Sequence, residues 1–186
     1  MKNINLLSLL LSLIYFSIMT NHSAAETMMK DNFQDPDQWE YISDNVMGGV
    51  STGNVEFQNI AGKSSAVLTG NVTTENNGGF IQIRRALNSV NLDKARSIKL
   101  IAKGNKQKYY VFLRTTGTIL PWQYYQSSFT VDEDFNVFIL PIGKFKKSGF
   151  LMASKINPRK ITSVGLVAFG RDHHAELIVK EIEFIE

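Results

Sequence analysis

The sequence has 186 residues, of which 44% are apolar and 20% are charged, and it contains no cysteine. The net charge of +3 excludes a polybasic nucleic-acid-binding protein as the default interpretation, so we expect no nucleic-acid partner. A chain of this length buries about 70% of its unfolded surface, so its core needs neither a disulfide nor a metal ion.

Residues 1–25 have the pattern of a secretory signal peptide. Lys2 precedes an apolar stretch from Leu6 to Met19, and the small residues that follow predict cleavage after Ala25. This stretch is shorter than the roughly 20 residues that a membrane-spanning helix needs, so we expect no transmembrane span after cleavage. The pattern predicts an exported protein located in the periplasm, with the extracellular medium as the alternative.

From Trp39 onward, the sequence has the pattern of short β-strands joined by turns. Apolar residues recur at period two or in short runs, and Gly, Asn, Asp and Ser bound these runs. The expected strands are residues 55–57, 66–69, 80–84, 97–102, 109–114, 128–131, 137–140, 164–169 and 177–185. Residues 91–96 are expected to form one helical turn. The pattern therefore predicts one all-β domain over residues 26–186, an antiparallel β-sandwich or jelly roll.

Two glycine-containing loops are the strongest local features of the sequence. The candidate binding residues in the first loop are Asp44, Asn45, Met47, Gly48, Gly49 and Ser51, and those in the second are Asn76, Asn77, Gly78 and Gly79. Adjacent glycines permit positive φ angles and the close approach of a ligand or another backbone. The loops either bind a ligand or shape the fold, the second one as a hairpin turn with left-handed residues.

Two arginines lie on expected strands beyond these loops. Arg84 follows Gln82 by two residues and so lies on the same strand face, and Arg114 ends an aromatic strand. Because a buried arginine almost always has a partner, Asp44 is a candidate carboxylate partner for them. The arginines either line a cleft or form a structural ion pair.

Residues 121–126 combine aromatic and amide side chains in one stretch. Trp122, Gln123 and Tyr124 suit a glycan or peptide groove, because sugar rings stack on aromatic faces and amides bond to hydroxyl groups. In the alternative interpretation, Trp122 and one tyrosine fill the core. Strand alternation turns one side of this stretch outward in either register.

The groups that an enzyme would use are mostly absent from the sequence. His173 and His174 are adjacent, so on a strand they would point to opposite faces and would not share a metal ion; a solvated turn is the better interpretation. Asp31, Asp35 and Asp37 are a weak basis for a calcium site. We therefore expect a protein that is not an enzyme, with no catalytic residues, no metal site and no cofactor.

A run of basic residues within the C-terminal third of the chain, residues 144–160, contains no acidic residue. It comprises Lys144, Lys146, Lys147, Lys155, Arg159 and Lys160. Such a run can bind an anionic lipid surface, a sulfated glycan or an acidic protein, but charge runs are more often solvated loops.

Several stretches resemble the complex I intermediate-associated protein 30 family. They are Asp31-Asn32-Phe33, Trp39, the loop of residues 44–51, residues 76–80 with Arg84, Lys103-Gly104-Asn105 before Tyr109, Phe129-Thr130, Leu140-Pro141-Ile142 with Phe145, and residues 161–171. The resemblance covers residues 31–186. It implies a jelly roll similar to galactose-binding domains and related in shape to many carbohydrate-binding modules. The best-known members of the family are mitochondrial assembly factors for respiratory complex I and are not enzymes.

Two functional hypotheses follow from the sequence and the resemblance. The first is a non-catalytic exported binding module that binds an envelope or membrane protein, as an assembly factor or chaperone does. The alternative is a carbohydrate-binding module of the cell envelope, whose ligand is a glycan. In both, the candidate binding residues are those of the two glycine loops together with Arg84, Arg114, Trp122, Gln123 and Tyr124.

Overall fold

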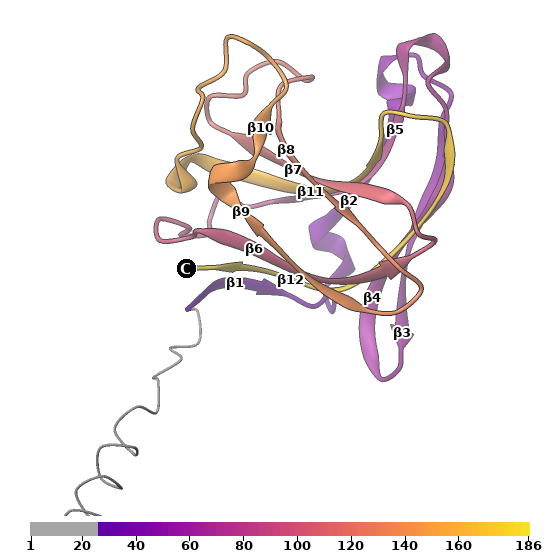
Figure 1. Ribbon diagram of the computed structural model, residues 1–186, viewed down its shortest axis with the longest axis horizontal. Coiled ribbons are helices and arrows are strands. Elements are labelled where there is room, and N and C mark those ends of the chain that lie inside the picture. Colours follow the sequence, from indigo (N-terminus) through magenta and orange to yellow (C-terminus); the bar gives the residue numbers. More distant parts are fainter. Residues whose placement is uncertain (1–25) are drawn as a thin grey trace, which may run out of the picture.

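The computed structural model describes residues 26–186, so the predicted signal peptide lies outside the described residues. This part of the chain forms two antiparallel six-stranded sheets that pack face to face as two layers (Figure 1). The all-β, two-sheet sandwich predicted from the sequence is therefore confirmed.

The first sheet contains both ends of the described chain. Its strands, in spatial order, are β3 (Thr52–Ile60), β4 (Lys63–Val72), β12 (His173–Ile185), β6 (Ser97–Gly104) and β9 (Asn136–Pro141), and β1 (Thr27–Asp31) also pairs with β12. The β1–β12 pairing places Thr27 opposite Ile185, beside the C-terminus. Lys30 of β1 forms ion pairs of 2.6 and 2.7 Å with Glu181 and Glu183 of β12. These contacts fasten the first strand to the last.

In the second sheet, only one pair of adjacent strands is also consecutive in the chain. The sheet consists of β10 (Lys146–Lys147), β8 (Tyr125–Thr130), β7 (Lys108–Thr115), β11 (Ile161–Phe169), β5 (Phe80–Ala86) and β2 (Trp39–Ser43). Short 3₁₀ helices lie in the connections: η1 (Pro36–Gln38), η2 (Asp44–Met47), η3 (Glu75–Asn77), η4 (Ile142–Lys144) and η5 (Pro158–Lys160).

Strand alternation separates the core from the outer face of the second sheet. In β5, Ile81 and Ile83 are buried between the sheets, whereas Phe80, Gln82 and Arg84 point to the other side. The large side chains that are fully buried include Phe33, Leu68, Ile98, Leu100, Tyr109, Leu113, Leu166 and Phe184. Both sheets contribute to this core, so the outer face of the second sheet is free to carry polar and aromatic residues.

A buried tyrosine links the two sheets near one end of the sandwich. The hydroxyl of Tyr109 donates a 2.7 Å hydrogen bond to Oδ1 of Asn105 and accepts one of 2.7 Å from the backbone N–H of Glu176. Burial raises the pKa of Tyr109 to about 12. The Asn105–Tyr109 stretch that resembles the family pattern thus closes this end of the core.

Asp31 anchors the first turn of the chain. Its carboxylate accepts hydrogen bonds from the backbone N–H of Phe33 at 2.7 Å and from Nε1 of Trp39 at 2.8 Å, and it forms an ion pair with Arg85. Trp39 is only 6% exposed. Asp31 therefore has an internal structural role.

The structure differs from the sequence prediction in three strands and two turns. Strands β1, β2 and β10 have no counterpart among the predicted runs. Residues 91–96 contain a hydrogen-bonded turn, from the N–H of Ala95 to the oxygen of Leu92, and no helix. The second glycine loop crosses from β4 in one sheet to β5 in the other, so it is not a hairpin turn.

Candidate functional site

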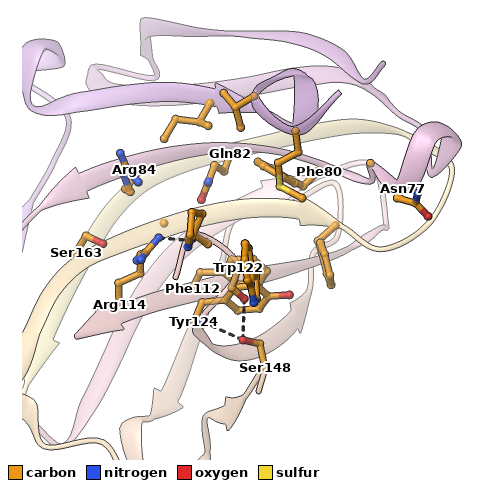
Figure 2. Close-up of a pocket in the computed structure, with 17 residues that line it drawn as sticks. Asn77, Phe80, Gln82, Arg84, Phe112, Arg114, Trp122, Tyr124, Ser148 and Ser163 are labelled. Atoms are coloured by element: carbon orange, nitrogen blue, oxygen red, sulfur yellow. Dashed lines mark hydrogen bonds between the residues drawn. The ribbon is translucent and has the colours of Figure 1, made fainter. Parts of the chain in front are cut away.

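A cleft of about 850 Å³ lies on the outer face of the second sheet. Strands β5, β11 and β7 form its floor, and loops at both ends of the sheet form its sides (Figure 2). Its lining residues are Ile42, Val46, Met47, Asn77, Gly78, Phe80, Gln82, Arg84, Phe112, Arg114, Pro121, Trp122, Tyr124, Ser148, Ser163, Gly165 and Phe169. Its size falls within the range of small-molecule binding sites.

Two arginines stand on either side of β11 at one end of this cleft. Arg84 on β5 pairs in register with Gly165, and Arg114 on β7 pairs with Ser163, two residues earlier on the same central strand. Neighbouring strands lie about 4.8 Å apart and each residue advances about 3.4 Å along a strand, so the backbones of the two arginines are about 12 Å apart, with only small residues between them. Figure 2 shows both guanidinium groups at the same end of the cleft, beside Ser163.

The two arginines have different partners. Nη2 of Arg84 donates a 2.9 Å hydrogen bond to Glu40, which is directly opposite it on β2. Arg114 donates hydrogen bonds of 3.0 to 3.1 Å to the backbone oxygens of Thr118, Leu120 and Pro121. Burial and the neighbouring Arg84 lower the pKa of Arg114. The expected partner, Asp44, contacts neither arginine, because its carboxylate is engaged elsewhere.

Aromatic side chains form one wall of the cleft. The ring of Tyr124 stacks on that of Phe112 with centroids 3.9 Å apart and planes 9° from parallel, and Phe169 contacts both rings edge-on. Burial raises the pKa of Tyr124, with a smaller contribution from Tyr110. Of the two adjacent tyrosines, Tyr125 is the one that enters the core.

Trp122 extends this wall from an ordered loop. Its side chain is 60% exposed. Oε1 of Gln123 accepts hydrogen bonds from the backbone N–H groups of Ile119 and Leu120, and Oγ of Ser148 donates to the backbone oxygen of Trp122. Gln123 therefore shapes the loop, while Trp122 presents an apolar surface to the cleft.

Gly165 gives the cleft its depth. A Cβ at this position would stand 2.8 Å from Oε1 of Gln82, on the cleft side of the sheet. Any side chain here would fill the space between β5 and β7. The absence of one leaves room for a ligand against the strand backbone.

The first glycine loop is organised around the buried carboxylate of Asp44. This carboxylate accepts four hydrogen bonds: two from the N–H and Oγ of Ser51, at 3.0 and 2.5 Å, and two from the N–H groups of Gly79 and Phe80, at 2.5 and 3.2 Å. Burial alone would raise the pKa of Asp44, but these donors outweigh it and lower the pKa below its ordinary value. Asp44 thus ties the two glycine loops together.

The glycines in both loops are required by this arrangement. Cβ atoms at Gly49 or Gly78 would collide with the Asp44 side chain. The left-handed conformation occurs at Gly48, with φ of 88°, and at Asn76 and Asn77, with φ of 55° and 59°. Asparagine and glycine tolerate this region better than other residues.

The structure brings together seven of the candidate residues from the sequence. Met47, Asn77, Gly78, Arg84, Arg114, Trp122 and Tyr124 line the cleft. Asp44, Ser51, Gly49 and Gly79 form the hydrogen-bonded and packed group behind its rim. Asn45, Gly48, Asn76 and Gln123 lie nearby without lining it.

Sequence reasoning missed ten of the lining residues. They are Ile42, Val46, Phe80, Gln82, Phe112, Pro121, Ser148, Ser163, Gly165 and Phe169. Period-two alternation from Arg84 and Arg114 identifies Gln82, Phe80 and Phe112 as sharing their faces. The residues of β11 are adjacent to both arginines only through strand pairing, which no local pattern specifies.

The two histidines lie in a strand, directly after the turn of residues 170–172, and not in the solvated turn expected from the sequence. They begin β12, where His173 is partly buried, with Nδ1 2.8 Å from the oxygen of Arg171, and His174 is exposed. Burial lowers the pKa of His173. Among residues 26–186, no three His, Cys, Asp or Glu side chains gather as a metal site, and no helix there has the length and apolar character of a membrane span.

Comparison with known proteins gives one family and one kind of fold. The model of the complex I intermediate-associated protein 30 family matches residues 28–178. No curated protein sequence matches the chain significantly.

The solved structures that resemble this one include carbohydrate-binding modules. The family 11 module from Clostridium thermocellum in complex with a β-1,3-1,4-mixed-linked tetrasaccharide superposes with a TM-score of 0.72 at 14% identity, covering 88% of this chain and 96% of that chain. The family 11 module of a cellulosomal cellulase from the same organism gives 0.71 at 14% identity, covering 88% and 97%. A family 30 carbohydrate-binding module gives 0.50 at 13% identity, covering 72% and 83%. At these identities the likeness concerns the fold.

Proposed function

This chain belongs to the complex I intermediate-associated protein 30 family, and from that premise we propose that it is a non-catalytic module that binds a carbohydrate in the cleft on its second sheet. The aromatic wall of this cleft carries the proposal. Trp122 and Tyr124 offer flat apolar surfaces beside the polar groups of Gln82, Ser163 and Arg114. This combination suits a sugar, whose ring faces are apolar and whose edges carry hydroxyl groups.

The similarity in fold supports the same proposal. Modules of family 11 share the two-sheet sandwich, and one of them was solved with a bound tetrasaccharide. We extend to this chain the class of ligand, a glycan, and also the galactose-binding-like jelly roll that the family resemblance implies.

A titration with oligosaccharides tests the proposal. The sequence has two tryptophans, of which Trp39 is buried and Trp122 is 60% exposed in the cleft, so ligand-induced fluorescence changes report mainly on Trp122. We expect saturable quenching and heat release with at least one glycan from a panel that includes β-1,3-1,4-mixed-linked tetrasaccharide. Product analysis after long incubation should find the glycan unchanged. The proposal fails if no glycan in the panel binds.

A matched pair of variants ties binding to the cleft. Trp122→Ala should reduce affinity about 5- to 30-fold, because about 1 to 2 kcal/mol of stacking is lost. Phe150→Ala is the control, because Phe150 is 85% exposed but does not line the cleft. Equal losses in both variants would contradict the assignment of the site.

We propose protein binding as a second function, because apolar side chains are exposed on two adjacent loops. Ile119, Phe150 and Leu151 are 84%, 85% and 79% exposed. The hydroxyl of Ser148 joins their loops, because it accepts a hydrogen bond from the N–H of Tyr124 and donates one to the oxygen of Trp122. Single apolar residues on a surface are normal, but a group of them suits an envelope or membrane protein as partner. A photo-reactive residue at position 150 should then crosslink to one defined protein in cells, and recovery of the monomer alone would reject this function.

Export to the periplasm is also a proposal, based on the pattern of residues 1–25. Determining the N-terminal residue of the protein purified from its own cells tests it. A mature chain that begins at Glu26 in a periplasmic extract is the expected result, and a chain retaining residues 1–25 in the cytoplasm would refute it.

A further inference from the structure

The two charged side chains that line the cleft are both cationic. Its lining includes Arg84 and Arg114 and contains no carboxylate. The nearest acidic partner, Glu40, pairs with Arg84 from the neighbouring strand, and its side chain is 66% exposed. The end of the cleft nearest β7 therefore carries a positive charge that no carboxylate of the described residues offsets within 4 Å.

Arg114 is held in a position to receive an anion. Three backbone oxygens fix its two terminal nitrogens, and these oxygens are neutral acceptors that leave the charge of the guanidinium in place. Burial and the nearby Arg84 both disfavour the cationic form and lower the pKa of Arg114. An anion placed between the two arginines would relieve both effects.

The floor between the arginines provides the necessary room. Only Gly165 and Ser163 of β11 stand between them, and the hydroxyl and amide groups of Ser163 and Gln82 border the same space. Figure 2 shows this polar end continuing directly into the aromatic wall at Phe112 and Tyr124. A sugar ring stacked on the aromatic wall would thus bring a ring substituent close to the arginines.

We propose that the glycan bound by this cleft is acidic, with a carboxylate or sulfate on the sugar located between Arg84 and Arg114. This inference rests on the proposed function and specifies its ligand class. Arginine suits the task, because it donates charge-assisted hydrogen bonds to oxyanions, and Arg114 uses only three of its five N–H groups on the loop oxygens. A neutral glycan would leave Arg114 without a counter-charge, since the ion pair of Glu40 is with Arg84.

Matched acidic and neutral oligosaccharides test the inference. The uronate arm compares a galacturonate trisaccharide with its methyl ester, and the sulfate arm compares a sulfated galactan oligosaccharide with its desulfated form. We expect the acidic member of at least one pair to bind at least tenfold more tightly than its neutral counterpart. We also expect this preference to shrink as salt rises from 50 to about 500 mM, because salt screens exposed charges.

Charge variants localise the effect. Arg114→Gln and Arg84→Gln should each remove most of the preference for the acidic ligand, whereas Lys155→Gln, an exposed charge change outside the cleft lining, should retain it. Glu40→Gln should strengthen acidic binding by releasing Arg84 from its pair. If Arg114→Gln disturbs the loop that its side chain anchors, Arg84→Gln provides the independent test.

The outcomes separate this inference from the proposed function. Equal binding of acidic and neutral members in both pairs overturns the inference and leaves carbohydrate binding intact. Binding of neither member of any pair, together with no binding of the wider glycan panel, overturns the proposed function itself. A preference for the acidic ligand that survives both arginine substitutions also refutes the inference, because other residues would then bind the acidic group.

Discussion

Gly78 packs directly against the carboxylate of Asp44, so closely that a Cβ at residue 78 would overlap with Oδ2. The contact joins two loops that are more than thirty residues apart in the sequence and form one rim of the cleft.

Gly78→Ala should therefore lower the free energy of unfolding by about 2 kcal/mol, because the methyl group overpacks a buried site. Chemical denaturation checks the value. Gly143→Ala is the control, since no atom lies within 4 Å of a Cβ at that position, and its effect should be below about 0.5 kcal/mol. Similar stability of the two variants would contradict the packing described here.

Asp44→Asn should destabilise the fold by about 3 kcal/mol, because an amide presents a donor to backbone N–H groups that need an acceptor. Circular dichroism during urea unfolding measures the loss. Asp134→Asn, in an exposed turn, provides a control that should leave stability nearly unchanged.

Asp44 should also contribute to the acid sensitivity of the wild type. Folding lowers the pKa of Asp44. The ionised carboxylate therefore contributes to the free energy of unfolding above the unfolded-state pKa of about 3.9, and this contribution is lost as the pH falls through the folded-state pKa. The stability difference between wild type and Asp44→Asn should thus narrow below about pH 4. A difference that stays constant down to pH 2 would show that folding does not lower the pKa of this carboxyl group.

Gly165→Val should abolish glycan binding while the protein remains folded. The added side chain enters the cleft beside Gln82, whose amide end is free to move away, so the stability cost should be about 1 kcal/mol. Calorimetry with the best ligand measures the loss of affinity. Ser128→Val, on the exposed outer face of β8 but outside the cleft lining, should bind normally, and full binding by Gly165→Val would place the ligand elsewhere.

Tyr109→Phe should cost about 1 to 2 kcal/mol, because the N–H of Glu176 loses its acceptor. The pKa of Tyr109 is about 12 in the folded state and about 10 in the unfolded state. The contribution of its hydroxyl to stability is therefore full below pH 10 and declines as the pH rises toward 12. Unfolding curves of wild type and variant at pH 8 and 11 should differ less at the higher pH. An unchanged difference would argue against burial of this hydroxyl.

The sequence predicted most of the strands, because alternation such as Ile81 and Ile83 against Gln82 and Arg84 depends only on local period. It did not predict β10, which has two residues, or the pairing of Arg84 with Glu40, since that partner lies 44 residues away. For the site, the sequence identified Trp122 and both arginines by residue type. It placed Asp44 and Ser51 among the ligand-binding candidates because a loop carboxylate that binds a ligand and one that binds its own backbone have the same sequence signature.

The pairing of β1 with β12 has a mechanical consequence. Tension applied to the two ends of the described chain acts first on the hydrogen bond between Glu186 and Glu26, and then on the Thr27–Ile185 pair. The bonds of β1 would open one after another, like a zipper, at low force. The cleft is on the other sheet, so β1 should detach from a stretched molecule before the ligand is released. Optical-tweezer traces should show this detachment as an early step.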